Sequence, residues 1–340
     1  MIRGLFNPMK RGHSKPMLTL DDAFEMVAAH YVVATQVYDR FSRFGYLRLH
    51  GNYGTGKSRF LELMARICYR GTYMGGAYSR AVLYRILAQY PGTLCLDEAD
   101  FHELSFRGDL VKILNTGYQA NGCVWRCADG RHDHEPRRYR SFGPKVLASR
   151  HQYQDESLES RILSQHSRKA EREVPPSLSS SEIQEEISEL RNLLFGYRVS
   201  RWHTISEDGP VQGLEGLDLR TAEILRPLAL ALGKNELPPE IIDYARSLTV
   251  ARQARRLRSL EAQTLRTLMR FHEEGRVPYV REVAEKVNGH NRSYSAITDR
   301  KMGAVLATLG IERTRTREGR RVDIDPDHLR NLMDQYGLEE

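Results

Sequence analysis

The sequence of 340 residues contains no apolar run that approaches the ~18 residues of a membrane-spanning helix. Its opening stretch, Met1 to Pro8, lacks the charged start, apolar middle and small-residue cleavage site of a secretory signal. Only four cysteines are present, which is too few to build a disulfide scaffold in a chain of this length. These absences disfavour membrane proteins and disulfide-rich secreted proteins, so we expect a cytoplasmic chain with reduced thiols.

Apolar residues make up 40% of the sequence and charged residues 28%, which is enough apolar material for a buried core. The length leaves room for about two domains of ~150 residues each. Basic residues exceed acidic ones by 51 − 44 = 7, and the pI is near 9.2. The excess of positive charge favours a polyanionic partner. Arginines gather in three stretches, at 131–140, 252–270 and 313–321.

The polar stretch from Arg172 to Ser181, with Pro175 and Pro176 inside it, is the strongest sign of a domain boundary. Upstream of it, strand patterns alternate with helical patterns, which is typical of an α/β fold with a parallel sheet. Downstream of it the pattern is helical. We predict four regions: a helical segment at 1–44, an α/β core at 45–172, a helical region at 173–250 and a C-terminal module at 251–340.

Short apolar runs predict strands in the core at 46–50, 93–97 and 145–149, and helical spacing predicts helices at 57–68, 79–90 and 108–118. A hairpin is predicted between residues 121 and 140. Further helices are predicted at 183–194, 219–232 and 239–248. In the C-terminal module, apolar residues from Leu257 to Met269 predict one long helix, followed by helices at 280–287 and 295–309 and a hairpin over 311–324.

The most specific motif is Gly51-Asn-Tyr-Gly-Thr-Gly-Lys-Ser58, which matches G-x-x-x-x-G-K-[ST] between a predicted strand and a predicted helix. In such a P-loop, backbone N–H groups and the helix N-terminus hold phosphates, the lysine reaches the terminal phosphates and the hydroxyl ligates Mg²⁺. The residues predicted to bind ATP here are Gly51, Asn52, Tyr53, Gly54, Thr55, Gly56, Lys57 and Ser58.

A P-loop needs a carboxylate partner for Mg²⁺ at the end of a neighbouring strand, and Asp97 follows the apolar run 93–96. We predict that Ser58 and Asp97 hold Mg²⁺. Glu98, the next residue, is placed to orient and polarise an attacking water. A glutamate in this position favours hydrolysis of a nucleoside triphosphate over transfer to a small-molecule acceptor.

The order of these motifs resembles AAA+ ATPases, in particular the superfamily 3 and minichromosome-maintenance helicase branch. More specifically, it is similar to the helicase-like ATPase domains of plasmid, phage and integrative-element replication proteins. The resemblance covers residues 20–235 and rests on an ordered set of short stretches. These are 29–33, the P-loop, 93–100, 113–117, 134–138, 142–145, 157–161, 219–220 and 226–228.

The resemblance implies a P-loop AAA+ core with a helical lid at 173–250, and a homo-oligomer that forms a hexameric ring. Ser149 matches the polar sensor at the end of a core strand, with Arg150 as a rival for that role. Arg161 matches the arginine finger, which reaches the nucleotide of the adjacent subunit. Arg220 matches a second sensor arginine on the lid. The chain departs from its relatives after the sensor strand, where it carries the polar run 150–155.

Helicases of this branch also insert a hairpin whose tip grips single-stranded DNA in the ring pore. The resemblance places that hairpin at 121–140, where five basic side chains could contact phosphates without reading bases. They are Arg131, His132, His134, Arg137 and Arg138.

Cys123, Trp125 and Cys127 share one face of the first strand of this hairpin. Two cysteines four residues apart on a strand are ~13 Å apart, too far for one tetrahedral zinc ion, so packing explains them better.

The C-terminal module resembles a winged-helix domain. Arg300 and Lys301 lie near the start of the third helix, which would be the recognition helix. Arg315, Arg317 and Arg320 decorate the hairpin that would be the wing. This arrangement of positive charge favours contact with duplex DNA phosphates.

Two functions fit these features. The first is an ATP-driven DNA helicase or translocase of a mobile-element or replication system. The second is an AAA+ assembly or loading factor that uses ATP to assemble on DNA and recruit a partner without unwinding. A small-molecule kinase is disfavoured by Glu98 and by the basic C-terminal module. A winged-helix transcription factor with a decayed ATPase domain is disfavoured because the P-loop and the Asp97-Glu98 pair are intact.

Overall fold

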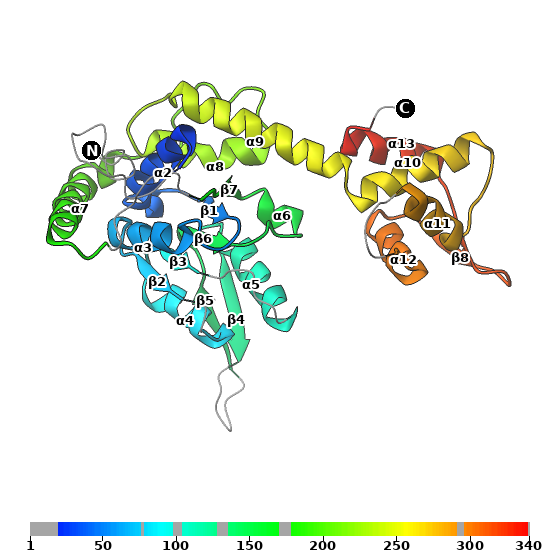
Figure 1. Ribbon diagram of the computed structural model, residues 1–340, viewed down its shortest axis with the longest axis horizontal. Coiled ribbons are helices and arrows are strands. Elements are labelled where there is room, and N and C mark those ends of the chain that lie inside the picture. Colours follow the sequence, from blue (N-terminus) through cyan, green and yellow to red (C-terminus); the bar gives the residue numbers. More distant parts are fainter. Residues whose placement is uncertain are drawn as a thin grey trace. The chain divides into compact units, whose positions relative to one another are not determined.

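The computed structural model describes residues 20–75, 78–97, 104–127, 135–169, 178–290 and 296–338 (Figure 1). The chain divides after Arg246 into two compact units, which are described separately below. This division falls close to the predicted boundary at residue 250, but the predicted lid helices belong to the first unit. No helix within the described ranges is both long and apolar enough to cross a membrane.

The first unit contains a parallel sheet whose five described strands follow the order β2-β3-β6-β1-β7. The predicted strands are confirmed as β1 (Tyr46–His50), β3 (Leu94–Leu96) and β6 (Lys145–Ser149), which occupy its centre. Sequence patterns did not predict β2 (Thr72–Met74) or β7 (Ile162–His166). These two strands lie at the sheet's edges, where polar side chains are tolerated and a continuous apolar run is not required.

The register of the sheet brings the predicted motifs to one edge. His50 at the end of β1 pairs with Ser149 at the end of β6, and Leu96 at the end of β3 pairs with Leu147. Since all these pairings are parallel, the P-loop after β1, Asp97 after β3 and Ser149 meet at the carboxyl edge, where α/β sheets bind ligands.

Helices flank this sheet (Figure 1). Helix α3 contacts four of its strands, and the hydroxyl of Tyr31 on α2 donates to the carbonyls of Gly45 and Lys145 at its amino edge. The helices of the α/β part are α2 (Asp22–Thr35), α3 (Lys57–Ile67), α4 (Arg80–Gln89), α5 (Leu104–Thr116) and α6 (Glu156–Glu159), with a 3-10 turn at Tyr38–Arg40.

The helical part of the first unit follows β7. It comprises α7 (Ser181–Arg201), a 3-10 turn at Trp202–Thr204, α8 (Leu219–Leu230) and the start of α9 (Pro239–Leu257). Ser180 and Asp218 cap the first turns of α7 and α8 through their side-chain oxygens. Such caps satisfy backbone N–H groups that have no partner within the helix, so both starts are encoded locally.

The predicted hairpin is confirmed as β4 (Cys123–Cys127) and β5 (Pro136–Arg140), an antiparallel pair that is separate from the main sheet. The prediction that Trp125 packs into the protein is wrong, because its side chain is 58% exposed. Cys127 is exposed as well. Alternate residues of a strand share one face, but that face is buried only where other elements pack on it. This strand pair lies outside the main sheet, and the face that carries Trp125 is not covered by a core of described residues.

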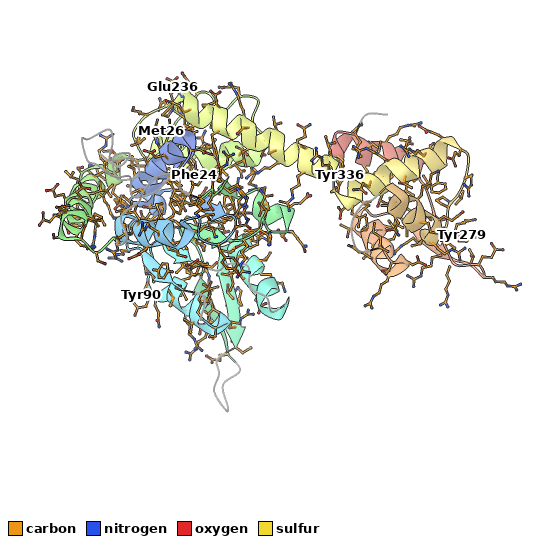
Figure 2. The ribbon with its side chains drawn as sticks, in the orientation of Figure 1. Phe24, Met26, Tyr90, Glu236, Tyr279 and Tyr336 are labelled. Carbon is orange, nitrogen blue, oxygen red and sulfur yellow. The ribbon has the colours of Figure 1, made fainter. Side chains whose placement is uncertain are left out.

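The second unit has its own apolar core, formed by three helices, a hairpin and a C-terminal helix. The predicted order of helix, helix, helix and hairpin is confirmed. The elements are α10 (Leu260–Glu273), α11 (Val280–His290), α12 (Asp299–Thr308), β8 (Arg313–Arg315), β9 (Arg320–Val322) and α13 (Pro326–Tyr336). Figure 2 labels Tyr279 just before α11, beside the hairpin, where it bridges to Arg321.

Two boundaries in the second unit differ from the prediction. The single long helix expected from Leu257 to Met269 is two helices, because α9 ends at Leu257 and the Ser259 side chain caps α10. Helix α12 begins at Asp299 rather than at 295, with Thr298 as its cap. Both residues are good N-caps, and an apolar pattern that continues across a cap hides the break.

An arginine is fully buried in the middle of β1. Arg48 donates to both carboxylate oxygens of Glu159 on α6, with Nη2 to Oε2 at 2.8 Å, and its guanidinium lies 5.3 Å from the ring of Tyr153. The side chain of Arg48 is 0% exposed and that of Glu159 is 11% exposed. Because a buried guanidinium requires a counter-charge, this pair ties α6 to the P-loop strand.

Glu159→Gln leaves the buried guanidinium without its counter-charge, and we expect the free energy of unfolding to fall by about 3 kcal/mol. Chemical denaturation is the measurement. The double variant Arg48→Met/Glu159→Met removes both charges and should recover most of the lost free energy of unfolding. As a control, Arg246→Gln removes one charge of an exposed ion pair and should change the free energy of unfolding by less than about 0.5 kcal/mol. A double variant as unstable as Glu159→Gln would contradict an electrostatic role.

Candidate active site

The loop after β1 has the backbone of a phosphate cradle. Gly54 and Gly56 have φ of 71° and 82°, in the left-handed region that favours glycine. At Gly51, with φ 147°, a Cβ atom would lie 2.9 Å from the carbonyl oxygen of Ser167. The side chain of Ser167 also bonds the loop, with 2.7 Å between its Oγ and Oγ1 of Thr55. Glycines are therefore required by this loop's conformation as well as by the motif.

The residues that follow the cradle begin α3. Lys57 is its first residue, and the Nζ atom donates to the carbonyls of Gly51 and Asn52 at 2.8 and 2.6 Å. The ammonium group therefore already lies against the loop. Ser58 is exposed, and Tyr53 is 71% exposed with the Arg150 guanidinium 4.1 Å from its ring centre.

One pocket of about 240 Å³ joins the predicted nucleotide residues. Its lining comes from the P-loop, the end of β3 and the end of β6, and includes Lys57, Ser58, Asp97 and Ser149. Oxygen ligands such as the Ser58 hydroxyl and the Asp97 carboxylate are what Mg²⁺ prefers, so the residues fit a Mg²⁺-bound nucleotide. Glu98, the predicted water-activating residue, lies outside the described residues.

Asp97 has a partner that sequence reasoning missed. The hydroxyl of Tyr73 on the edge strand β2 donates to Asp97 Oδ2 at 2.8 Å. Desolvation, together with this carboxylate, raises the pKa of Tyr73 to about 12, so the phenol stays protonated and remains a donor. Tyr73 therefore orients the carboxylate, and only the pairing of β2 with β3 could have revealed the contact.

Ser149 ends β6 and is 1% exposed. Its carbonyl accepts from the N–H of Gly51 at 3.1 Å, and its hydroxyl donates to the carbonyl of His151 at 2.8 Å. The position is therefore tied directly to the first glycine of the P-loop. Arg150, the rival for the sensor role, lines the same pocket.

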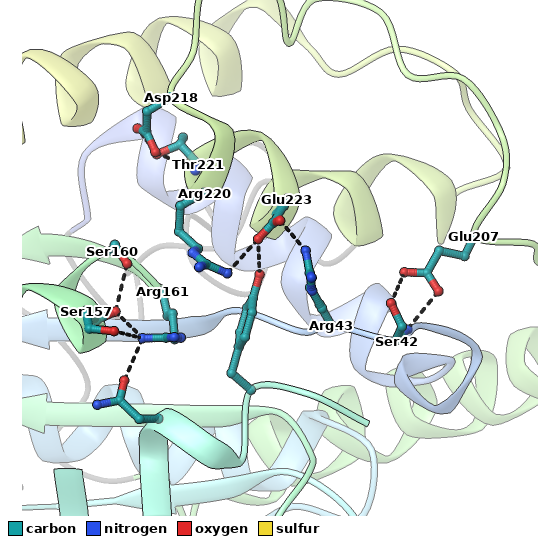
Figure 3. Close-up of polar contacts among 12 residues, drawn as sticks. Ser42, Arg43, Ser157, Ser160, Arg161, Glu207, Asp218, Arg220, Thr221 and Glu223 are labelled. Carbon is teal, nitrogen blue, oxygen red and sulfur yellow. Dashed lines mark hydrogen bonds and ion pairs between the residues drawn. The ribbon is translucent and has the colours of Figure 1, made fainter. Parts of the chain in front are cut away.

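Arg161 and Arg220 lie close together in the first unit (Figure 3). The Nη1 atom of Arg161 donates to Oδ1 of Asn115 at 2.6 Å and to Oγ of Ser157. Both guanidinium groups lie 5.3 Å from the ring centre of Tyr118. Burial, together with the positive charge of Arg220, lowers the pKa of Arg161.

Glu223 on α8 provides the negative charge of this arginine cluster. Its Oε2 accepts from Arg220 Nη1 at 2.7 Å and from the Tyr118 hydroxyl at 2.9 Å, and its Oε1 pairs with Arg43 (Figure 3). The carboxylate is shared by three donors from three segments, which positions Arg220 beside Arg161. Asn115 falls within the stretch 113–117 that carries the resemblance, but Glu223 lies outside every such stretch, so no sequence pattern indicated its contacts.

The cluster of Arg161 and Arg220 lies at the amino ends of the strands, whereas the P-loop of the same chain lies at their carboxyl ends. Arg161 directly precedes β7, whose first residue pairs with the first residue of β1, whereas the P-loop follows the last residue of β1. A strand of five residues spans ~16 Å. An arginine side chain does not bridge that distance, so neither arginine can reach a nucleotide in its own P-loop.

The predicted DNA-contacting residues fall into two groups. In the first unit, Arg137 and Arg138 are exposed on β5, while Arg131, His132 and His134 lie outside the described residues. In the second unit, the residues on the first turn of α12 and on the hairpin are all exposed. These are Arg300, Lys301, Arg315, Arg317 and Arg320. Arg313 instead turns back and donates to the Gly303 carbonyl.

Two histidines lie next to the P-loop. His50 and His166 end β1 and β7, and their ring centres are 5.2 Å apart. Burial, the charge of Arg48 and the neighbouring His166 lower the pKa of His50 to about 4. His50 is therefore neutral at pH 7 and adds no charge beside the phosphate cradle.

No family model matches the chain, and neither does any curated protein. Among solved structures, it is similar to the apo C-terminal region of NrS-1, with 11% identity and a TM-score of 0.37 over 88% of this chain and 71% of that one. It is also similar to JCV helicase, with 11% identity and a TM-score of 0.32 over 60% of each chain. A third similar structure is that of the Aeropyrum pernix ORC2 protein in its ADP form, with 13% identity and a TM-score of 0.28 over 98% of this chain and 97% of that one.

Stability should depend on the protonation of His50. The unfolded chain takes up a proton near pH 6.5 and the folded chain only near pH 4, so stability is fully present above pH 6.5 and is lost as the pH falls toward 4. Between pH 6.5 and pH 4, the free energy of unfolding of His50→Gln should fall by about 1–2 kcal/mol less than that of the wild type. This figure is reduced because the His50 ring is partly exposed. Denaturant unfolding at several pH values measures this effect, and His203→Gln, at an exposed histidine, is the control. If the free energy of unfolding depends on pH equally in the wild type and in His50→Gln, the prediction is refuted.

Proposed function

We propose that this chain is an ATP hydrolase of the AAA+ type that acts on DNA. The observation that carries the proposal is the single pocket that holds Lys57, Ser58, Asp97 and Ser149 at the carboxyl edge of a parallel sheet. Residues from three separate segments meet there in the arrangement that phosphoryl transfer uses. A chance glycine turn would not bring the carboxylate and the serine of two other strands to the same pocket.

Each residue of the pocket has a role in this proposal. The N–H groups of the P-loop and the start of α3 hold the phosphates, and Lys57 neutralises the terminal ones. Mg²⁺, held by Ser58 and Asp97, stabilises charge on the phosphate oxygens when it is bound. Tyr73 keeps the Asp97 carboxylate oriented. Glu98 polarises the attacking water, and Ser149 helps to hold that water in place.

The proposal requires a second copy of the chain to complete the site. Arg161 cannot reach its own P-loop, so it serves as an arginine finger for the nucleotide of the neighbouring subunit, with Arg220 beside it. An oligomer with each arginine cluster against the next P-loop is head-to-tail, an arrangement that forms a ring when its rotation closes, and a hexamer is the expected form. The contacts with Asn115 and Glu223 hold the two guanidinium groups ready for that neighbour.

The proposed partner is DNA. Single-stranded DNA would pass the exposed Arg137 and Arg138 of the β4–β5 hairpin, and exposed Trp125, which pairs across the hairpin with Arg138, adds a stacking surface. The second unit would hold duplex DNA as a winged helix, through the first turn of α12 and the β8–β9 hairpin. This favours a helicase or translocase of a replication or mobile-element system. A DNA assembly or loading factor is the second candidate, since its ATP site would be identical.

Arg161→Ala should leave ATP binding near normal and reduce hydrolysis by about 10³-fold, because the finger acts on the transition state. Glu98→Gln should bind ATP without hydrolysing it. Mixing the two variants should restore part of the ATPase rate, since one intact active site then meets one intact finger. Steady-state ATPase assays against the mixing ratio measure the rescue, and no rescue from mixed oligomers would count against a shared site.

Strand displacement separates the two candidate functions. A forked duplex with ATP and Mg²⁺ is offered to wild type and to Glu98→Gln, with oligomer size measured in the same buffer. Unwinding by wild type alone, from a ring-sized species, supports the motor. DNA-stimulated ATPase without displacement supports the assembly factor, and loss of all ATPase with retained DNA binding would contradict the hydrolase itself.

A further inference from the structure

A second pocket of the first unit lies away from the P-loop, between the end of α3 and α7, with a volume of about 750 Å³. These two helices contact each other and are neighbours in Figure 1. The described lining includes Arg66, Arg70, Arg191 and Arg198 and no carboxylate. A pocket with this lining attracts an anion.

The arginines of this pocket differ in how they are held. Arg198 is fixed by Asp39, with Nη2 to Oδ2 at 2.8 Å, and its guanidinium lies 4.2 Å from the ring centre of Tyr69. Arg66 pairs with Glu62 and donates to a backbone carbonyl. Arg70 and Arg191 are exposed and have no carboxylate partner among the described residues. Two guanidinium groups are therefore available to bind phosphate.

The backbone at Arg70 is strained. Its φ of 45° is the only left-handed value that the described part of the chain shows at a residue other than glycine. Gly92 lies against it, because a Cβ at Gly92 would come within 2.5 Å of the Arg70 carbonyl oxygen. Strain of this kind persists where the surrounding structure holds it, and it is concentrated at ligand sites. Arg70 is one of the residues that line the pocket.

Helix α7 contributes one face to the pocket. Ser188, Arg191, Phe195 and Arg198 follow helical spacing, so their side chains lie on the same side of the helix. Phe195 is 65% exposed, one turn from Arg191. An exposed aromatic ring between guanidinium groups is the combination that binds a nucleic-acid strand, with the ring stacking on a base and the arginines holding phosphates.

The pocket continues along α3 toward the P-loop. A neighbouring hollow of about 490 Å³ shares Arg66 and Gly71 with it, and shares Ser58 and Arg59 with the P-loop pocket. The first two hollows form one groove over the outer face of α3, which ends beside the P-loop pocket and also contains Glu62, the partner of Arg66. Together these two hollows offer more volume than a mononucleotide needs, which suits an extended polymer.

We propose that this groove binds single-stranded nucleic acid, with Arg70 and Arg191 on backbone phosphates and Phe195 stacked on a base. The site is separate from the β4–β5 hairpin and from the second unit, and it does not depend on ATP hydrolysis. Binding is therefore tested without nucleotide, so its failure and the failure of the proposed ATPase are distinguishable.

The first test uses the full-length chain and a fluorescent oligothymidylate of about 20 nucleotides, with anisotropy measured over a range of salt concentrations. Arg70→Gln/Arg191→Gln should weaken binding by about 10-fold and lower the salt slope by about 1.4, since each phosphate contact on a single strand contributes ~0.7. Phe195→Ala should weaken binding about 5-fold without changing the slope. Lys234→Gln/Arg246→Gln, which also removes two exposed charges from the first unit, should change neither value.

The second test locates the strand, because other surfaces of the chain can also bind DNA. An oligonucleotide carrying 4-thiothymidine is photocrosslinked to the wild-type chain, and the modified peptides are mapped. Crosslinks should fall on the α7 face near Phe195 and should disappear in Arg70→Gln/Arg191→Gln. Crosslinks confined to 121–140 or to the second unit, together with unchanged affinity of that variant, would overturn the proposal.

Two competitors identify the chemistry of the occupant. AMP at millimolar concentration should not remove the α7 crosslinks, since a mononucleotide spans too little of the groove. Polyglutamate should compete only weakly, because it offers no base to stack. Full competition by AMP would reassign the pocket to a free nucleotide, and binding of polyglutamate in preference to the oligonucleotide would reassign it to an acidic protein. Either result rejects the proposal.

Discussion

The buried pair of Arg48 and Glu159 is the interaction on which the geometry of the proposed active site depends. Arg48 is in the middle of the strand that carries the P-loop, and Glu159 is on the short helix that leads to Arg161. Removing either member leaves the other charge buried and uncompensated, so this geometry depends on both side chains being present. The P-loop strand and the segment that carries Arg161 are thereby connected through one buried ion pair.

That connection has a consequence for how subunits would communicate. The P-loop is at the carboxyl edge of the sheet and the arginine cluster at the amino edge, with β1 and β7 between them in register. A movement of β1 on nucleotide binding would be transmitted through Arg48 and Glu159 to Ser157 and Arg161. In the proposed ring, those residues would face the next nucleotide.

The positive charge of the molecule is distributed over separate surfaces. The hairpin β4–β5, the β8–β9 hairpin with α12, and the groove along α3 each expose arginines, and two of them also expose an aromatic ring, Trp125 or Phe195. A net charge of +7 does not reveal this division. The proposed helicase would use separate surfaces for the two DNA strands.

Local chemistry made much of the fold predictable. The P-loop, the apolar central strands and the capped helices depend on short-range rules, and the structure agrees with them in type and closely in position. The misses have physical causes. β2 and β7 are edge strands with polar residues, Ser259 interrupts an apolar pattern that continues past it, and Trp125 is on a strand pair with no core behind it.

The phosphate-cradle motif can be recognised from the sequence, because it needs glycines, a lysine and a hydroxyl at fixed spacing along one continuous segment. The grouping of Arg161 with Arg220 can be seen only in the folded structure. Arg161 and Arg220 are 59 residues apart in sequence and both lie against the ring of Tyr118. Strand register places Arg161 at the amino ends of the strands, and Glu223 holds Arg220 beside it. The groove of Arg70 and Arg191 likewise exists only because α7 packs against the end of α3. Contacts between distant segments follow from packing, which local sequence patterns do not encode.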